Sequence, residues 1–111
     1  MNTIKPQNHE MDSDEEIAKE LSFVQNTMSK LHYQPGKLLD DIPQLHKFLV
    51  TVFERHLRTL KCPMEGGGWV GTRVIRARMR IDHDKIDEIL AYDDGRNFEH
   101  DEGRWHIRLR R

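Results

Sequence analysis

Cysteine is nearly absent from this sequence, in which Cys62 is the single example among 111 residues. One cysteine cannot form an intrachain disulfide and cannot supply the thiolates of a structural zinc site. Long apolar runs are also missing, since no segment approaches the ~18 residues that a membrane span needs. The first residues have the features of neither a signal peptide nor a transit peptide. We therefore expect an intracellular protein, cytoplasmic or nuclear, that makes no contact with a membrane.

An excess of charge of either sign is missing as well. Eighteen basic and 19 acidic side chains give a formal net charge of −1, which argues against a broad electrostatic surface for DNA. Any nucleic-acid contact must then depend on a local basic cluster. With 36% hydrophobic residues, the chain has room for one domain with a modest core and for an extension outside that core.

Motifs for catalysis and for metal or cofactor binding are missing too. Seven histidines are present, but none stands in the HxxxH or HExxH spacing that places two ligands on one helix face. The three glycines at 66–68 lack the Lys-Ser/Thr of a phosphate-binding loop, and Cys62 has no evident base partner. We predict a non-enzymatic protein without metal or cofactor, in which the glycines form a linker.

The N-terminal third predicts a tail and a helix. Residues 1–12 are polar and without periodicity, which predicts a disordered tail. Ser13 and Glu16 form a capping box, so we expect residues 13–36 to hold a helix and the turn at Pro35-Gly36 that ends it. A narrow apolar stripe on this helix is typical of paired helices; its members are Ile17, Leu21, Val24, Met28 and Leu31. Packing within the chain and a self-dimer interface both remain open.

The rest of the chain, residues 37–111, is expected to form the main domain. Its first helix begins near Pro43, with Asp40 or Asp41 as the N-cap, and Cys62-Pro63 ends it. A wide apolar stripe at helical spacing predicts that this helix is the centre of the core. The stripe consists of Leu45, Phe48, Leu49, Val52, Phe53, Leu57 and Leu60.

Residues 73–81 allow two interpretations. As a strand, the segment alternates apolar residues with Arg76, Arg78 and Arg80. As a helix capped by Thr72, it turns near Arg80 and leads into a second helix that starts near Asp82. The apolar residues that follow the spacing of a helix-turn-helix pair are Ile75, Met79, Ile81, Ile86 and Leu90. The flanking order of elements favours the helix, although periodicity alone decides nothing here.

Residues 45–109, about 60% of the chain, resemble a winged-helix domain. The resemblance consists of a long helix, a tiny strand at Trp69-Val70, two short helices and a closing hairpin. It implies a mainly α fold with a small β-hairpin, a winged helix-turn-helix preceded by an additional N-terminal helix. It also implies that Phe98 and Trp105 anchor the hairpin to the core. A small unrelated α+β domain with an arginine-faced strand is the alternative.

The resemblance implies DNA binding or protein binding. The acidic residues of the second short helix favour a protein partner, and the arginines elsewhere favour DNA. Residues 82–90, in the place of the recognition helix, carry four acidic residues against one lysine and one histidine. Carboxylates oppose phosphates and rarely read bases. Basic residues beside the turn and in the hairpin are the candidate nucleic-acid contacts: Arg73, Arg76, Arg78, Arg80, Lys85, Arg104, Arg108 and Arg110, with Arg111 at the end.

Two functions follow from this balance. The first is a small DNA-binding protein, a transcriptional regulator or accessory factor that contacts phosphates through arginines. The second is a protein-interaction module that acts as a subunit of a larger assembly. Six or more arginines clear of carboxylates on one face would favour DNA. Ion pairs between the arginines and the neighbouring acids would favour a protein partner or a merely solvated surface; these acids are Asp82, Asp84, Asp87 and Glu88.

Overall fold

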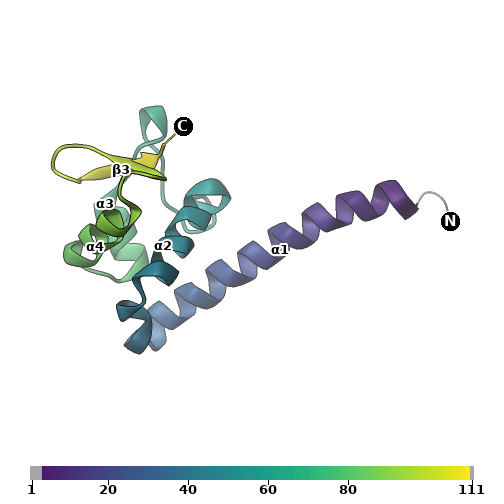
Figure 1. The fold of residues 1–111 in the computed structure, drawn as a ribbon, viewed down its shortest axis with the longest axis horizontal. Coiled ribbons are helices and arrows are strands. Elements are labelled where there is room, and N and C mark those ends of the chain that lie inside the picture. Colours follow the sequence, from purple (N-terminus) through teal and green to yellow (C-terminus); the bar gives the residue numbers. More distant parts are fainter. Residues whose placement is uncertain (1–3, 111) are drawn as a thin grey trace.

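The computed structural model describes residues 4–110, with side chains from residue 14 onward. In this part of the chain the helices are α1 (Ile4–Tyr33), α2 (Ile42–Thr51), α3 (Thr72–Met79) and α4 (His83–Asp93), and the strands are β1 (Val70–Gly71), β2 (Phe98–His100) and β3 (His106–Leu109). Short helical turns η1 (Gly36–Asp40), η2 (Val52–His56) and η3 (Gly66–Gly68) join them. Figure 1 shows a body built from α2 to β3, from which α1 projects.

The predicted hairpin is present and belongs to a three-stranded antiparallel sheet of order β1-β3-β2. Val70 of β1 pairs with Ile107, and Phe98 of β2 pairs with Leu109. Ile107 and Phe98 are buried on the side of the sheet that faces the core. The protein is therefore mainly helical with a small antiparallel sheet, as the sequence predicts at that level.

Helix α2 forms the centre of the core, which confirms the predicted apolar stripe. Asp41 is its N-cap and accepts a hydrogen bond from the backbone nitrogen of Gln44 at 3.1 Å. Leu45 and Phe48 are completely buried. The helix continues into η2, whose backbone has π-helical hydrogen bonding, and Lys61 with a positive φ of 57° ends this region.

Residues 72–79 are helical, which decides between the two interpretations of this segment. Helical spacing brings Thr72, Ile75 and Met79 to one buried face. Arg80 adopts the left-handed conformation (φ 57°, ψ 43°) and forms the predicted turn before α4. Asp82 is the N-cap of α4, as expected, and its side chain accepts from the backbone nitrogen of Lys85 at 2.9 Å. Thr72 is not the N-cap of α3, because Gly71 precedes the helix and the Thr72 hydroxyl bonds elsewhere.

Helix α1 is longer than predicted. It begins at Ile4 and includes residue 13, so the expected capping box does not mark its start, and residues 4–12 are helical where a disordered tail was expected. Once a packed segment has nucleated a helix, further turns can extend it at little cost. Residues 1–3 of the predicted tail lie outside the described residues. None of the described helices is both long and apolar enough to cross a membrane.

The apolar stripe of α1 is divided between the core and solvent. Val24 and Leu31 are buried in the chain's own core, at 0% and 2% exposure, whereas Ile17 is 40% exposed. Leu21 and Met28 are half-buried. Packing within the chain therefore uses the C-terminal part of the stripe, and a dimer interface along its full length would require Val24 and Leu31 to leave the core.

Candidate interaction surface

The start of α3 holds the hairpin loop in place. The Thr72 hydroxyl lies 2.9 Å from the carbonyl oxygen of Arg104 and 3.1 Å from that of Trp105, and donates to this pair. The Thr72 backbone nitrogen also donates to the Trp105 carbonyl at 2.8 Å. Thr72 is 1% exposed, so these bonds are shielded from water. They fix the loop between β2 and β3 relative to α3 and α4.

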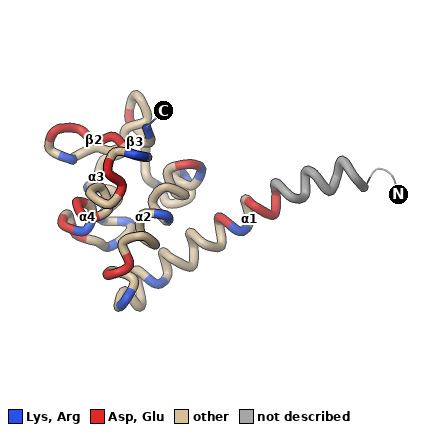
Figure 2. The backbone as a smooth tube through the Cα atoms, in the orientation of Figure 1, with Lys and Arg blue, Asp and Glu red and all other residues tan. Residues whose placement is uncertain are grey.

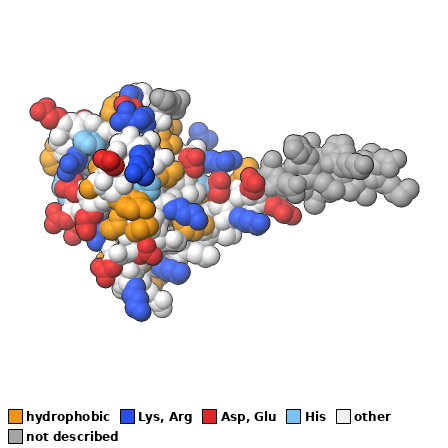
Figure 3. Space-filling model, in the orientation of Figure 1, with side chains coloured by type: hydrophobic (Ala, Val, Ile, Leu, Met, Phe, Trp, Pro, Cys, Tyr) orange, Lys and Arg blue, Asp and Glu red, His pale blue; other side chains and the backbone are white. Residues whose placement is uncertain are grey.

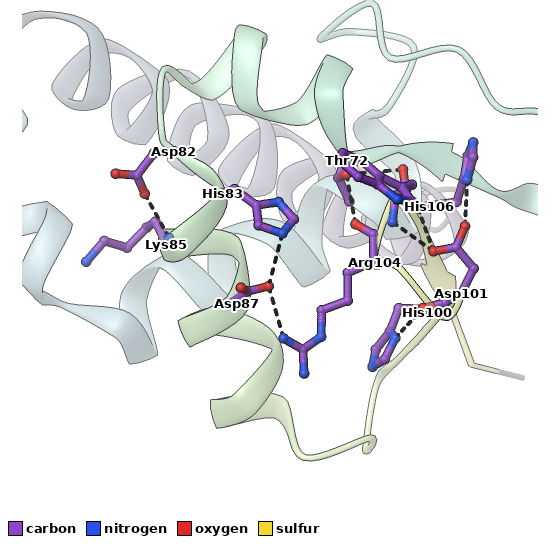
Figure 4. Close-up of polar contacts among 10 residues, drawn as sticks. Thr72, Asp82, His83, Lys85, Asp87, His100, Asp101, Arg104 and His106 are labelled. Atoms are coloured by element: carbon purple, nitrogen blue, oxygen red, sulfur yellow. Dashed lines mark hydrogen bonds and ion pairs between the residues drawn. The ribbon is translucent and has the colours of Figure 1, made fainter.

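The loop then contacts α4 through side chains. A guanidinium nitrogen of Arg104 lies 3.2 Å from Oδ1 of Asp87, and Nε2 of His83 lies 3.6 Å from the same oxygen. Figure 4 shows Arg104 reaching from the loop toward Asp87, with His83 on the same side of α4. The His83 ring also packs against the ring of Trp105, with centroids 5.8 Å apart. The Arg104 and Asp87 contact is a partly exposed ion pair, worth about 0–1 kcal/mol.

Trp105 does not anchor the hairpin to the core, contrary to the sequence-based expectation. Its side chain is 60% exposed, whereas Phe98 is 2% exposed and performs that role. Phe98 packs edge-on against Phe53, with ring centroids 5.2 Å apart. The physical reason lies in the loop, because the Trp105 carbonyl bonds to Thr72 and its side chain is left outside, against His83.

Asp101 organises the loop from its other side. Its carboxylate accepts from the backbone nitrogen of Trp105 at 2.8 Å and lies 2.7 Å from Nδ1 of His106, while Nε2 of His106 lies 3.3 Å from Glu65. The His106 hydrogen bond is the main cause that lowers the pKa of Asp101, against a smaller effect of burial. The same bond raises the pKa of His106, with a further contribution from Glu65.

These shifts predict how the loop responds to pH. Because folding raises the pKa of His106, protonated His106 stabilises the folded state. This contribution is complete below the pKa of the unfolded chain, about 6.5, and is lost as pH rises through the pKa of the folded protein. Because folding lowers the pKa of Asp101, its ionised carboxylate stabilises the folded state. This contribution is present above the pKa of the unfolded chain, about 3.9, and is lost as pH falls through the pKa of the folded protein. We expect His106→Asn to flatten the decline of the thermal midpoint between neutral and alkaline pH, and His100→Asn to preserve it. Identical pH profiles of wild type and His106→Asn would contradict this.

Several of the predicted nucleic-acid contacts are engaged within the chain. Lys85 pairs with Glu88 at 3.0 Å, Arg104 pairs with Asp87, and Arg108 pairs with Glu99 at 3.1 Å. Arg108 also lies over the Trp69 ring, 4.3 Å from its centroid, on the face of the sheet opposite the buried Ile107. Arg110 donates to the carbonyl oxygen of Gly95 at 2.7 Å.

The arginines in and directly after α3 differ from these contacts because they form no ion pair among the described residues. Arg73, Arg76, Arg78 and Arg80 have no carboxylate within 4.0 Å among the described residues. Three of them are exposed, and Nε of Arg76 is buried without a hydrogen-bond partner in that part of the chain. With Arg110 they make five of the predicted contacts that have no carboxylate within 4.0 Å among the described residues. Arg111 lies outside the described residues.

Helix α4 and the hairpin form the most acidic part of the body. Residues 82–105 contain nine acidic and three basic residues, a formal net charge of −6 with histidine neutral. Figure 2 shows acidic positions on α4 and on the loop between β2 and β3. Asp84 and Glu88 are exposed on α4, and Glu102 is exposed on the loop. Two large exposed aromatics flank the helix: Trp105 near its start, and Tyr92, 51% exposed, near its end. We call α4 with residues 100–105 the acidic surface.

The cysteine and the histidines of α2 and η2 are engaged within the chain. Burial raises the pKa of the Cys62 thiol, opposed in part by Arg78, so the thiol stays protonated at neutral pH and is a weak nucleophile. His46 and His56 bond to Asp93 and Glu20 respectively. Among the side chains that the structure describes, no three metal-ligating groups come together.

Sequence reasoning missed the exposure of Trp105, because large aromatic residues are highly buried on average. It allowed for arginines that pair with the acids of residues 82–88, but it could not say which arginine meets which acid. The contact of Arg104 with Asp87 depends on how the loop docks on α4. No protein-family model matches the chain, and no curated protein is significantly similar to it.

Proposed function

We propose that this protein is a winged-helix module that binds a basic protein partner through the acidic surface. The observation that carries the proposal is the charge of α4, whose exposed residues include Asp84 and Glu88 where a DNA-reading helix would need to approach phosphates. Residues 82–105 have a formal net charge of −6. Asp93 is buried, and the remaining excess of carboxylates repels the DNA backbone and attracts a basic protein surface.

The order of elements supports the winged-helix part of the proposal. A core helix, a short strand, two helices joined by a tight turn and a closing hairpin follow one another along the chain. The strand order β1-β3-β2 places the short strand beside the hairpin. This likeness concerns the fold, and fold by itself does not assign a function.

The two exposed aromatics supply the apolar part of such an interface. Protein interfaces depend on a few large anchors, with tryptophan and tyrosine prominent among them. Trp105 already rests against His83, and Tyr92 rests against His46 with ring centroids 5.1 Å apart. Each is therefore partly ordered before binding, which lowers the entropic cost of burying it. Carboxylates between them would select a partner that carries arginine or lysine.

Binding to two labelled probes of opposite charge tests this function. We expect a lysine- and arginine-rich amphipathic peptide to bind with micromolar affinity at low salt and more weakly at physiological salt, measured by fluorescence anisotropy. Asp84→Lys with Glu88→Lys should weaken the peptide complex at least tenfold. The matched control is Asp40→Lys with Glu54→Lys, two exposed acidic residues outside the acidic surface, which should retain the affinity.

A random-sequence DNA duplex is the second probe, and it tests the other candidate function. The four arginines of residues 73–80, without an acidic residue among them, favour phosphate binding. If they bind DNA, the duplex binds at low salt, and each arginine replaced by alanine lowers the salt slope by about 0.9. Such a result, with the peptide unbound, would replace the proposed function by DNA binding. An inert duplex and a bound peptide would support the acidic surface.

A further inference from the structure

The described end of α1 projects from the body without a partner. Among the side chains that the structure describes, Glu20 is the last one toward the N-terminus with an ion pair to the body, to Arg55 at 3.2 Å. Residues 14–19, which we call the arm, are all exposed. The arm carries acidic side chains at 14, 15 and 16, opposed by Lys19 alone, and its one large apolar residue is Ile17. Figure 3 shows charged side chains around the point where α1 leaves the body.

A groove of complementary character lies beyond η2. It is an open cavity of about 520 Å³ lined by Leu57, Arg58, Lys61, Cys62, Pro63 and Met64. Four of these side chains are apolar or weakly polar, and Met64 is 61% exposed. Arg58 and Lys61 are exposed and make the charge of the groove basic. Apolar walls with a basic edge suit an acidic amphipathic helix.

The arm of the same chain is not placed to fill this groove. Val24 and Leu31 fix the following turns of α1 in the core. The helix is continuous from Ile4 to Tyr33, and a sharp bend within a helix requires a specific break. Figure 1 shows α1 leading away from the body on one line. An arm must therefore come from another molecule.

We propose that the groove receives the arm of a second copy of this chain. Each molecule carries both complementary surfaces, so two copies can exchange arms about a two-fold axis and close the assembly. Ile17 enters the groove beside Met64, and Glu15 and Glu16 of the arm face Arg58 and Lys61. The proposal is independent of the acidic surface and of its partner.

The size of the molecule fits this exchange. The 30 residues of α1 span about 45 Å at 1.5 Å per residue. The Cα radius of gyration is 15.8 Å, above the roughly 13 Å of a compact chain of this length. Ile17 on the projecting turns is 40% exposed, so burying it against a second molecule would stabilise the assembly. The exchange also leaves Val24 and Leu31 in the core, unlike an interface along the whole stripe.

Charge reversal tests the contact in the full chain. Sedimentation velocity over a concentration series should show a monomer–dimer equilibrium that weakens as salt is raised. We expect Arg58→Glu with Lys61→Glu, the groove variant, to raise the dimer dissociation constant at least tenfold. Glu15→Lys with Glu16→Lys, the arm variant, should do the same. All four residues are exposed, and circular dichroism checks that both variants fold.

Mixing the two variants is the decisive step. In the mixed pair, the acidic arm of the groove variant meets the basic groove of the arm variant, and the basic arm meets the acidic groove. Both contacts regain opposite charges, so a heterodimer should form from two variants that are monomeric alone. Arg73→Glu with Arg96→Glu, two exposed residues that do not line the groove, is the control and should dimerise as wild type does. A wild type that stays monomeric, a dimer that ignores both reversals, or a mixture without a heterodimer would overturn the proposal.

Discussion

Replacing Asp93 with alanine is expected to lower the free energy of unfolding by about 3–5 kcal/mol, the range for breaking a buried charged network. The Asp93 side chain is 1% exposed and lies 2.7 Å from Nε2 of His46. It also accepts from the backbone nitrogens of Asn97 and Phe98, at 3.1 Å and 3.0 Å, and from the Asn97 amide. Alanine would leave these donors buried without an acceptor.

The neighbouring aspartate provides the matched control. Asp94 is exposed and adopts the left-handed conformation at the end of α4 (φ 52°, ψ 38°). Asparagine tolerates that conformation, so Asp94→Asn should change stability by no more than about 0.5 kcal/mol. Urea unfolding followed by circular dichroism measures both variants. Equal midpoints for Asp93→Ala and Asp94→Asn would show that the Asp93 network does not stabilise the fold.

Acid should destabilise the wild type and the Asp93→Ala variant to different extents. Burial opposes ionisation of Asp93, but hydrogen bonds from His46, Phe98 and Asn97 outweigh it and lower the pKa of the carboxyl. The lowered pKa contributes stability that is present above the unfolded value of about 3.9 and is lost as pH falls through the folded pKa. Asp93→Ala should therefore show a shallower loss of stability in acid than the wild type.

Phe98→Ala is expected to cost about 3–5 kcal/mol, as other truncations of buried aromatic residues do. Phe98 is 2% exposed and its ring packs edge-on against Phe53 and His46, with centroids 5.2 Å and 6.1 Å apart. Since β2 has only three residues, the loss of this side chain would also release the edge of the sheet. Small domains have roughly 5–15 kcal/mol of stability in total, so the variant should be substantially unfolded at elevated temperature.

Trp105→Ala tests whether Trp105 stabilises the hairpin as Phe98 does. Its side chain is 60% exposed and touches the His83 ring, so truncation should cost under about 1 kcal/mol. The thermal midpoints of the two variants give the comparison directly. If Trp105→Ala were as damaging as Phe98→Ala, the hairpin would be anchored through both aromatics, as the sequence resemblance implies and the packing does not.

The starts of α2 and α4 were predictable because local chemistry determines them, whereas the predicted starts of α1 and α3 were wrong. Asp41 and Asp82 cap α2 and α4 as expected, since their carboxylates accept backbone hydrogen bonds three residues along the chain. The apolar spacing of α2 and of Ile75, Met79 and Ile86 also predicted burial correctly, because one face of a helix is defined by its sequence alone.

Tertiary structure decided which residues of the same type are buried or paired and which remain in solvent. Asp93 and Asp94 together mark the end of a helix, but only docking of the hairpin makes one a buried acceptor and leaves the other in solvent. Arginines that count equally in sequence likewise divide, since Arg104 meets Asp87 and Arg78 meets no carboxylate among the described residues. Pairing across the fold depends on distances in space that sequence separation does not encode.

By itself, the sequence determined α2 and α4 with their N-caps, the hairpin and most of the core, because periodicity and capping act within a few residues. Only the tertiary structure decided that residues 72–79 are a helix, that α1 divides between core and solvent, and that Trp105 lies outside. Each of these depends on which surfaces find a partner at long range. Burial against such a partner contributes more free energy than the local preferences that left those segments ambiguous.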